Sequence, residues 1–371
     1  MSTQATAAPA GRPDRLQAPP AGPSHRGGGQ DDRRRSGLVH THAARALGLV
    51  VCLAVLVVCL ATSLTFGAKS IPVADVWNAL TAYDGSEDAY IVRDMRVPRA
   101  LLGLLVGAAL GVSGALIQAL TRNPLADPGI LGVNAGSGFA VVLGVAFLGL
   151  TTTEQYLGMA FAGAVVTTTL VYVLGSAGRA GATPIQLTLV GVALSAVLAG
   201  VSAAVTLLYP EVFDDLRGWA AGSLGAGGWD VLWTVLPFIG AGLLLSLVAA
   251  RSLNAVALGD DLARSLGAGI GRTRVTVVVA VTLLAGAATG AAGPIGFVGL
   301  MIPHVVRWFV GPDQRWIMPY TMVCAPILLT LADVVGRVVL SPQELQVGIV
   351  TAFIGAPVLI LLVRRRKASE L

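Results

Sequence analysis

The chain is poor in charge, in aromatic residues and in lysine, and each shortage excludes a class of protein. Charged residues make up 12% of the 371 positions, about half the share found in an ordinary soluble domain, whereas hydrophobic residues make up 55%. Aromatic residues make up 6%, and the apolar residues form continuous blocks of about 17–24 residues rather than alternating runs. These features predict an all-α integral membrane protein, spanned by helices and not by a barrel.

The scarcity of ionisable residues also limits the chemistry. The two lysines, Lys69 and Lys367, lie outside any G-x-x-x-x-G-K-[ST] loop, so the chain lacks the usual cradle for nucleotide phosphates. His304 has no zinc-type partner at helical spacing, and no Ser, His and Asp set shares a helix face. The three cysteines all lie in apolar blocks, as small core residues do. We expect no catalytic residue, no cofactor and no metal site.

The first 45 residues differ from the rest of the chain. They are rich in Pro, Gly, Ala and Arg without an apolar period, so residues 1–45 are predicted to be a disordered tail and 46–371 a membrane domain. Seven arginines and three aspartates give this tail +4 of the formal net charge of +5, which favours the cytoplasmic leaflet. A cleaved signal peptide is the alternative, but the block from Leu47 to Phe66 is as long as a full span.

Ten apolar blocks follow, and they predict about ten transmembrane helices. The eighth is short and follows Gly293-Pro294, so nine spans remain possible from hydropathy alone. An even count places both termini on one side, where the basic run Arg364-Arg365-Arg366-Lys367 and the basic tail are both cytoplasmic under the positive-inside rule. The blocks cover residues 46–66, 100–120, 131–150, 156–175, 185–208, 231–250, 275–293, 294–310, 316–335 and 346–363.

This topology leaves four arginines on the outer face, where the positive-inside rule does not expect them. They are Arg93, Arg96, Arg99 and Arg337. Outward arginines can hold an anionic partner, although long side chains that reach the lipid headgroups would explain the same pattern.

An internal repeat supports the ten-span topology. Six residues of the second block recur at a constant offset of 179 in the seventh block, and Pro124, after the second block, recurs at the same offset as Pro303 in the eighth. Five spans separate the copies, so they cross in opposite directions, as in inverted-repeat transporters, although small-residue packing alone could mimic the match. The pairs are Leu105 and Leu284, Gly107 and Gly286, Ala108 and Ala287, Ala109 and Ala288, Gly111 and Gly290, Gly114 and Gly293, and Pro124 and Pro303.

Two cytoplasmic segments are candidates for moving parts. Asn123 and Asp127 each precede a proline, which biases the backbone of both residues away from the helical conformation and ends the helix after the second span. The loop from 258 to 267 predicts a short helix that Asp260 caps, that carries Leu262 and Leu266 on one face, and that Gly267 ends. Such a helix suits a partner's groove or a lipid surface equally well. Broken helices also suit an ion-coupled secondary transporter, although charge-poor span interiors disfavour proton coupling.

Six segments resemble the permease family of binding-protein-dependent ABC importers for ferric siderophores, haem and cobalamin. The resemblance runs in order from about residue 46 to the end of the chain, and it implies a type II ABC importer permease fold. The segments are R-V-P-R (96–99), Q-A-L-T-R-N-P-L-A-D-P-G-I-L-G-V (118–133), A-L-G-D-D-L-A-R-S-L-G (257–267), G-P-I-G-F-V-G-L-M-I-P-H-V-V-R (293–307), L-A-D-V-V-G-R (331–337) and G-I-V-T-A-F-I-G-A-P-V (348–358).

The resemblance implies three functional sites. Arginines matching Arg96, Arg99 and Arg337 dock acidic residues on the two lobes of the substrate-binding protein, whereas Arg93 has no family counterpart. The turn matching Asn123, Pro124 and Leu125 belongs to the cytoplasmic gate; a second gate segment would fall near Thr183 to Gln186, where this sequence departs from the family. The segment matching the coupling helix comprises Gly259, Asp260, Asp261, Leu262, Ala263, Arg264, Ser265, Leu266 and Gly267.

The resemblance also implies the partners. They are a second permease subunit, identical or related, two cytoplasmic ATPase subunits that use the ATP, an extracytoplasmic binding protein and membrane lipid, with no nucleic acid. The expected location is the bacterial plasma membrane. An iron–siderophore complex is the expected cargo, with cobalamin and haem as alternatives.

Overall fold

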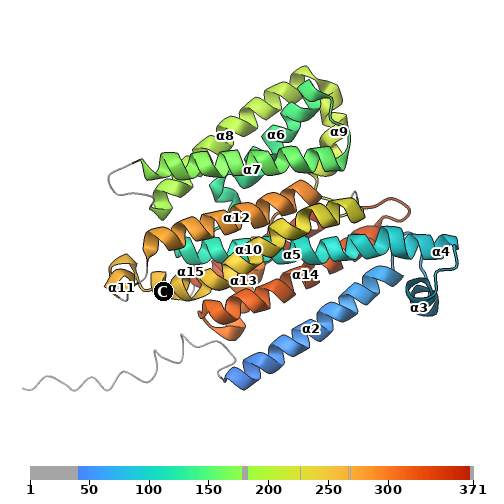
Figure 1. Cartoon of the computed structure of the whole chain (residues 1–371), viewed down its shortest axis with the longest axis horizontal. Coiled ribbons are helices and arrows are strands. Elements are labelled where there is room, and N and C mark those ends of the chain that lie inside the picture. The colour runs from blue at the N-terminus through green and yellow to red at the C-terminus, as the bar shows by residue number, and fades with distance from the viewer. Residues whose placement is uncertain (1–40, 178–182, 226, 266, 268, 368–371) are drawn as a thin grey trace, which may run out of the picture. The chain divides into compact units, whose positions relative to one another are not determined.

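The structure is a computed structural model that describes residues 41–177, 183–225, 227–265, 267 and 269–367, so residues 1–40 of the predicted tail lie outside it. Within these ranges every regular element is a helix (Figure 1). The elements are α2 (His42–Thr65), α3 (Val73–Thr81), α4 (Glu87–Tyr90), η1 (Ile91–Arg96), α5 (Val97–Thr121), η2 (Pro128–Leu131), α6 (Val133–Leu148), α7 (Thr153–Ser176), α8 (Pro184–Leu208), α9 (Pro210–Ala220), α10 (Trp229–Val256), α11 (Asp260–Ser265), α12 (Ile270–Ala292), α13 (Val298–Val310), α14 (Gln314–Val339) and α15 (Val347–Lys367).

Ten of these helices are apolar, and they match the ten predicted blocks in order. Seven are long enough to cross a membrane, and three are shorter apolar helices, α6, α13 and α15. The break before the eighth block is genuine, because α12 ends at Ala292, Gly293 has a φ of +72° and α13 begins only at Val298. Phe297 also takes a left-handed conformation there, which ends any helical continuity between the two elements. The prediction of ten helices, and not nine, is confirmed.

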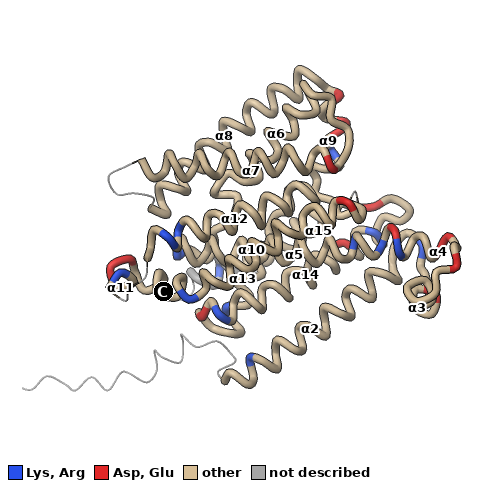
Figure 2. Tube along the Cα trace, in the orientation of Figure 1, with Lys and Arg blue, Asp and Glu red and all other residues tan. Residues whose placement is uncertain are grey.

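Charged side chains gather at the two ends of the helices, and the length between them is almost free of charge (Figure 2). We call the two ends the α4 end and the α11 end, after the short helix that lies at each. A band without charge bounded by two charged ends is the distribution expected of a protein whose middle lies in hydrocarbon.

The helix starts follow from local capping. Thr41 accepts a hydrogen bond from the backbone N–H of Ala44, so α2 begins at His42, four residues before the predicted start at 46. Thr152 with Gln155 and Thr183 with Gln186 form capping boxes that start α7 and α8. These polar residues satisfy the free N–H groups at helix ends, where apolar side chains could not.

The two copies of the internal repeat, α5 and α12, lie antiparallel and in contact (Figure 1). α5 packs on α14 and α12 packs on α7, which is the same relation once the two halves of the chain are exchanged. The repeated glycines make these contacts close: a Cβ added at Gly107 would lie 2.6 Å from the Cα of Pro326 in α14, and one added at Gly290 would lie 3.1 Å from the carbonyl oxygen of Leu157 in α7. The repeat is thus present in three dimensions as well as in the sequence.

The first helix of each half breaks this symmetry. α10 packs against α12 and α5, whereas its counterpart α2 packs mainly against α14. On that face the thiols of Cys52 and Cys324 lie 3.9 Å apart, and the hydroxyl of Tyr320 donates to the carbonyl of Arg45. Only 17% of the apolar window of α2 is buried, so α2 is a peripheral helix.

Candidate functional site

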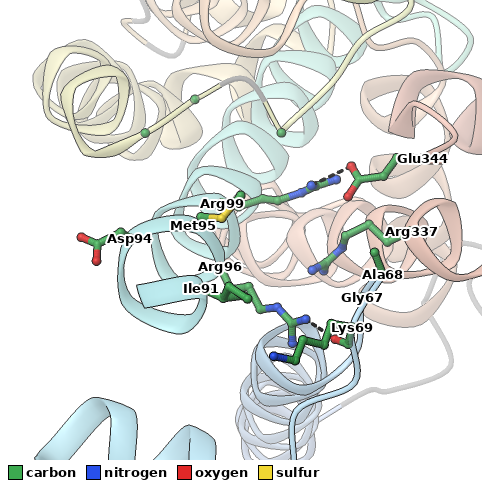
Figure 3. A pocket seen from close by; sticks show the side chains of 13 residues that line it. Gly67, Ala68, Lys69, Ile91, Asp94, Met95, Arg96, Arg99, Arg337 and Glu344 are labelled. Atoms are coloured by element: carbon green, nitrogen blue, oxygen red, sulfur yellow. Dashed lines mark hydrogen bonds and ion pairs between the residues drawn. The ribbon is translucent and has the colours of Figure 1, made fainter. Parts of the chain in front are cut away.

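The predicted docking arginines come together at the α4 end, where they line one pocket (Figure 3). Two of them flank the start of α5: Arg96 closes the π-helix η1, and Arg99 follows Pro98 in the first turn. Proline suits that turn because its missing N–H would have no partner in the helix anyway. The third, Arg337, lies in the last turn of α14.

Arg96 holds the end of α2. One guanidinium nitrogen donates to the carbonyls of Leu64 and Thr65, at 2.6 and 2.9 Å, and the other donates to the carbonyl of Lys69. The last carbonyls of a helix have no partner within it and carry the negative end of its dipole. A guanidinium at this position therefore satisfies both the hydrogen bonds and the charge, and Arg96 is only 6% exposed.

Arg337 reaches the same end of α2 from the other side. It donates to the carbonyl of Ser63 at 3.1 Å and to its hydroxyl at 2.7 Å. It also forms an ion pair with Asp333, one helical turn earlier, at 3.1 Å, and both side chains are more than nine-tenths buried. Arg96 and Arg337 together attach α2 to α5 and α14.

Arg99 completes this network through the same aspartate. Its Nε and Nη2 atoms contact the carboxylate of Asp333, with the shortest distance 2.8 Å, and its Nη1 contacts Glu344 at 2.8 Å. A planar guanidinium can make this two-pronged contact and a lysine cannot. Asp333 thus serves two arginines at once.

The pocket between these residues has a volume of about 310 Å³. Its charged lining comprises four cations and two carboxylates, which leaves an excess of two positive charges before the buried Asp333 is counted: Lys69, Arg96, Arg99, Arg337, Asp94 and Glu344. Lys69 is half-exposed, and its hydrogen bond to Asp88, 2.6 Å long, raises the pKa of its ammonium group. The net positive charge of the pocket favours binding of an acidic group, although each arginine already has partners within the chain.

Arg93 has a local role outside this pocket. It donates to the carbonyl of Leu80 at 3.1 Å and lies over the ring of Tyr83, 5.2 Å from its centre. The two contacts fix the last turn of α3 and the loop after it against η1.

The predicted gate turn lies at the opposite, α11 end. Arg122 ends α5 in a left-handed conformation, and Asn123 accepts a hydrogen bond from the N–H of Leu125 at 3.0 Å. Asp127 forms the same kind of turn: its carboxylate accepts a hydrogen bond from the N–H of Gly129, two residues later, at 2.8 Å. Two such turns in succession, each beside a proline, lead the chain into η2 and then α6. The helix η2, which follows these turns, abuts α8, because a Cβ added at Gly191 would lie 1.8 Å from the carbonyl oxygen of Ile130.

The predicted coupling helix forms α11 at the same end. Leu258 and Leu262 are 60% and 50% exposed, and Ala263 is buried beneath them. Gly267 has a φ of +80° and ends the turn as expected, whereas Leu266 lies outside the described residues. Asp260 does not precede the helix as a cap; it is the first residue of α11.

The carboxylate of Asp260 instead links three elements. It contacts Arg122, after α5, at 3.3 Å and Arg274, in the first turns of α12, at 2.6 Å. Arg122 directly precedes the gate residue Asn123, so one carboxylate joins the predicted coupling helix, the predicted gate turn and the second repeat helix. The sequence contains no local signal for this link, since its members lie 138 and 14 positions apart.

Comparison with known proteins gives a consistent family. The model of the FecCD transport family matches residues 55–365. The chain is 50% identical to the ferric enterobactin transport system permease protein FepD of Escherichia coli (strain K12), over 87% of this chain and 96% of that protein. It is 38% identical to the probable siderophore transport system permease protein YfiZ of Bacillus subtilis (strain 168), over 85% and 96%. It is 34% identical to the hemin transport system permease protein HmuU of Yersinia pestis, over 87% and 96%.

A solved structure is also similar. It is described as an inward-facing conformation of a metal-chelate type ABC transporter, with a TM-score of 0.77 and 27% sequence identity over 86% of this chain and 99% of the other. A second solved structure, of PsaBC from Streptococcus pneumoniae, shares the fold at a TM-score of 0.54.

Proposed function

This chain belongs to the FecCD transport family, and from that premise we propose that it carries an iron–siderophore complex across the bacterial plasma membrane. It is the permease subunit of an ABC importer, and the related permeases give no support to an ion-coupled carrier. The observation that supports this cargo is the 50% identity to a ferric enterobactin permease over nearly the whole of both chains. Ferric citrate, hydroxamate and hemin permeases are related at lower identity.

Uptake by the assembled importer tests the cargo. The chain would be produced with its cognate ATPase and binding protein in cells that lack their own siderophore permeases, and accumulation of radioactive ferric catecholate would be measured. We expect uptake that depends on ATP hydrolysis and is competed by ferric catecholates. Uptake competed instead by haem or cobalamin would show another cargo, and uptake without any ATPase would contradict the ABC mechanism.

We propose that the pocket at the α4 end receives an acidic side chain of the extracytoplasmic binding protein. The excess of positive charge in its lining supports this role. The buried contacts of Arg96 and Arg337 indicate that these two arginines also hold the fold, so reversing their charge would test folding and docking together. Exposed residues at the pocket separate the two effects.

Met95 provides such a test, because it lines the pocket and is 57% exposed. Met95→Glu places a negative charge beside the arginines and is expected to weaken binding of the binding protein by about threefold to fivefold at low salt, and by less at high salt. Affinity would be measured by surface plasmon resonance on the transporter in lipid nanodiscs. Met95→Gln, of similar size without charge, is the matched control. Equal affinities for the two variants would contradict docking at this pocket.

We propose that the α11 end faces the cytoplasm, with both termini on that side. The exposed Leu258, just before α11, and Leu262, on α11, suit the apolar groove of an ATPase subunit. The link through Asp260 offers a route from that subunit to the gate turn. A second permease subunit would complete the translocation path. Only 11% of the apolar window of α8 is buried within the chain, which supports α8 as part of the surface that faces that subunit.

A further inference from the structure

A groove between α7 and α12 is lined by none of the residues assigned above to docking, gating or coupling. Its volume is about 300 Å³, and its lining is almost wholly apolar. The lining residues on α7 are spaced as one helical face, Val165, Thr168, Thr169 and Tyr172, and those on α12 likewise, Val275, Val278, Val279, Thr282 and Leu283. The two faces lie side by side, since α7 and α12 are in contact.

The groove runs from the α11 end toward the middle of the helices. The last turns of α7 and the first turns of α12 both lie at the α11 end. Tyr172, near the end of α7, and Val275, near the start of α12, therefore lie near that end. Val165 and Leu283 lie deeper. The stretch from Val275 to Leu283 covers about 12 Å at 1.5 Å per residue, a large part of one leaflet of a hydrocarbon core about 30 Å thick.

The open end of the groove carries a cation. Arg272 lies three residues before Val275 and seven before Val279, so it shares their helix face. It is exposed, and no described residue forms an ion pair with it, whereas its neighbour Arg274 is held by Asp260 at 2.6 Å. Tyr172, opposite, has the apolar body and polar tip typical of residues at the membrane interface.

We propose that this groove binds an anionic phospholipid, with the phosphate headgroup on Arg272 and one acyl chain along α7 and α12. A positive charge at the mouth of an apolar groove about one leaflet long is complementary to that molecule in charge and in length. The proposal is independent of the cargo, and in the orientation proposed above the lipid belongs to the cytoplasmic leaflet.

Native mass spectrometry of the detergent-purified transporter tests the proposal, with phosphatidylglycerol and phosphatidylcholine of identical acyl chains as probes. We expect phosphatidylglycerol to be retained about fivefold more, as one arginine near a headgroup predicts. Arg272→Gln, at an exposed position, should remove this preference. Val279→Trp should lower the retention of both lipids by filling the groove.

Two controls match these variants. Arg315→Gln removes another exposed arginine at the α11 end, and Val166→Trp adds a tryptophan on α7 at an exposed position outside the groove. Both should retain lipid as the unmodified chain does. Equal retention of the two lipids by the unmodified chain would overturn the proposal, as would unchanged retention by Val279→Trp. Loss of the partner permease from Val279→Trp with lipid retention unchanged would show that protein covers the groove, and would overturn it too.

Discussion

Replacing Asp333 with alanine is expected to destabilise the protein by about 3–5 kcal/mol, because two largely buried arginines lose their shared counterion. Asp333 and Arg337 are 4% and 3% exposed, and Arg99 is 14% exposed. Without Asp333, the guanidinium of Arg337 would be held away from both water and carboxylate, and Arg99 would keep only the half-exposed Glu344. The measurement is unfolding in mixed detergent and sodium dodecyl sulfate, followed by circular dichroism.

Glu344→Gln is the control for this change. It removes the other carboxylate in contact with Arg99, but Glu344 is 41% exposed and its ion pair is worth at most about 1 kcal/mol. Arg99 keeps Asp333 in that variant. If both variants unfold at the same detergent composition, the shared counterion does not hold the α4 end together.

Replacing Asp260 with alanine is expected to lower transport by about tenfold or more while the ATPase subunits stay bound and hydrolyse ATP. The change breaks both contacts that tie α11 to the gate turn and to α12, at 3.3 and 2.6 Å. It leaves Leu258 and Leu262 exposed for the partner. Coupling free energies of 1–3 kcal/mol correspond to factors of about 5 to 150, and the expected loss lies in that range.

The neighbouring aspartate provides the matched control. Asp261 is fully exposed and, among the residues that the structure describes, pairs only with Arg264, within α11. Asp261→Ala should therefore transport as the unmodified chain does. Transport and ATP hydrolysis would be measured together in proteoliposomes, with copurification of the ATPase as the check on assembly. Equal transport by the two variants would mean that α11 does not act through Asp260.

The sequence was sufficient to predict the apolar helices, because a helix that crosses the hydrocarbon core needs an apolar run of a set length, which is visible in the sequence. All ten blocks became helices, and the glycine spacing of α5 and α12 correctly indicated an inverted pair. Of the short helices, the sequence predicted α11 and missed the others. α9, for example, buries only Val212 and Leu216 against α6 and α7 and carries charge on its other side, so its signal in hydropathy is weak.

The arginines show what the sequence could not settle. Their grouping at one end followed from the positive-inside rule, but their partners did not, because Arg99 and Asp333 are 234 positions apart. The spacing of Asp333 and Arg337 by one helical turn was the available signal for an ion pair. Most of the other partners of Arg96 and Arg337 are backbone carbonyls in α2 or just after it, which no sequence pattern marks.

The attachment of α2 also has a consequence for biogenesis. Ser63 and Arg337 are 274 positions apart, so at 5–20 residues per second the ribosome delivers the arginine roughly 14–55 s after the serine. During that interval α2 lacks α14, on which it mainly packs, and can contact only Arg96 and the other early segments near its last turn. Its 24 residues and mean hydropathy of 2.8 allow it to remain in the bilayer alone. The first helix to leave the translocon would then be one of the last to dock.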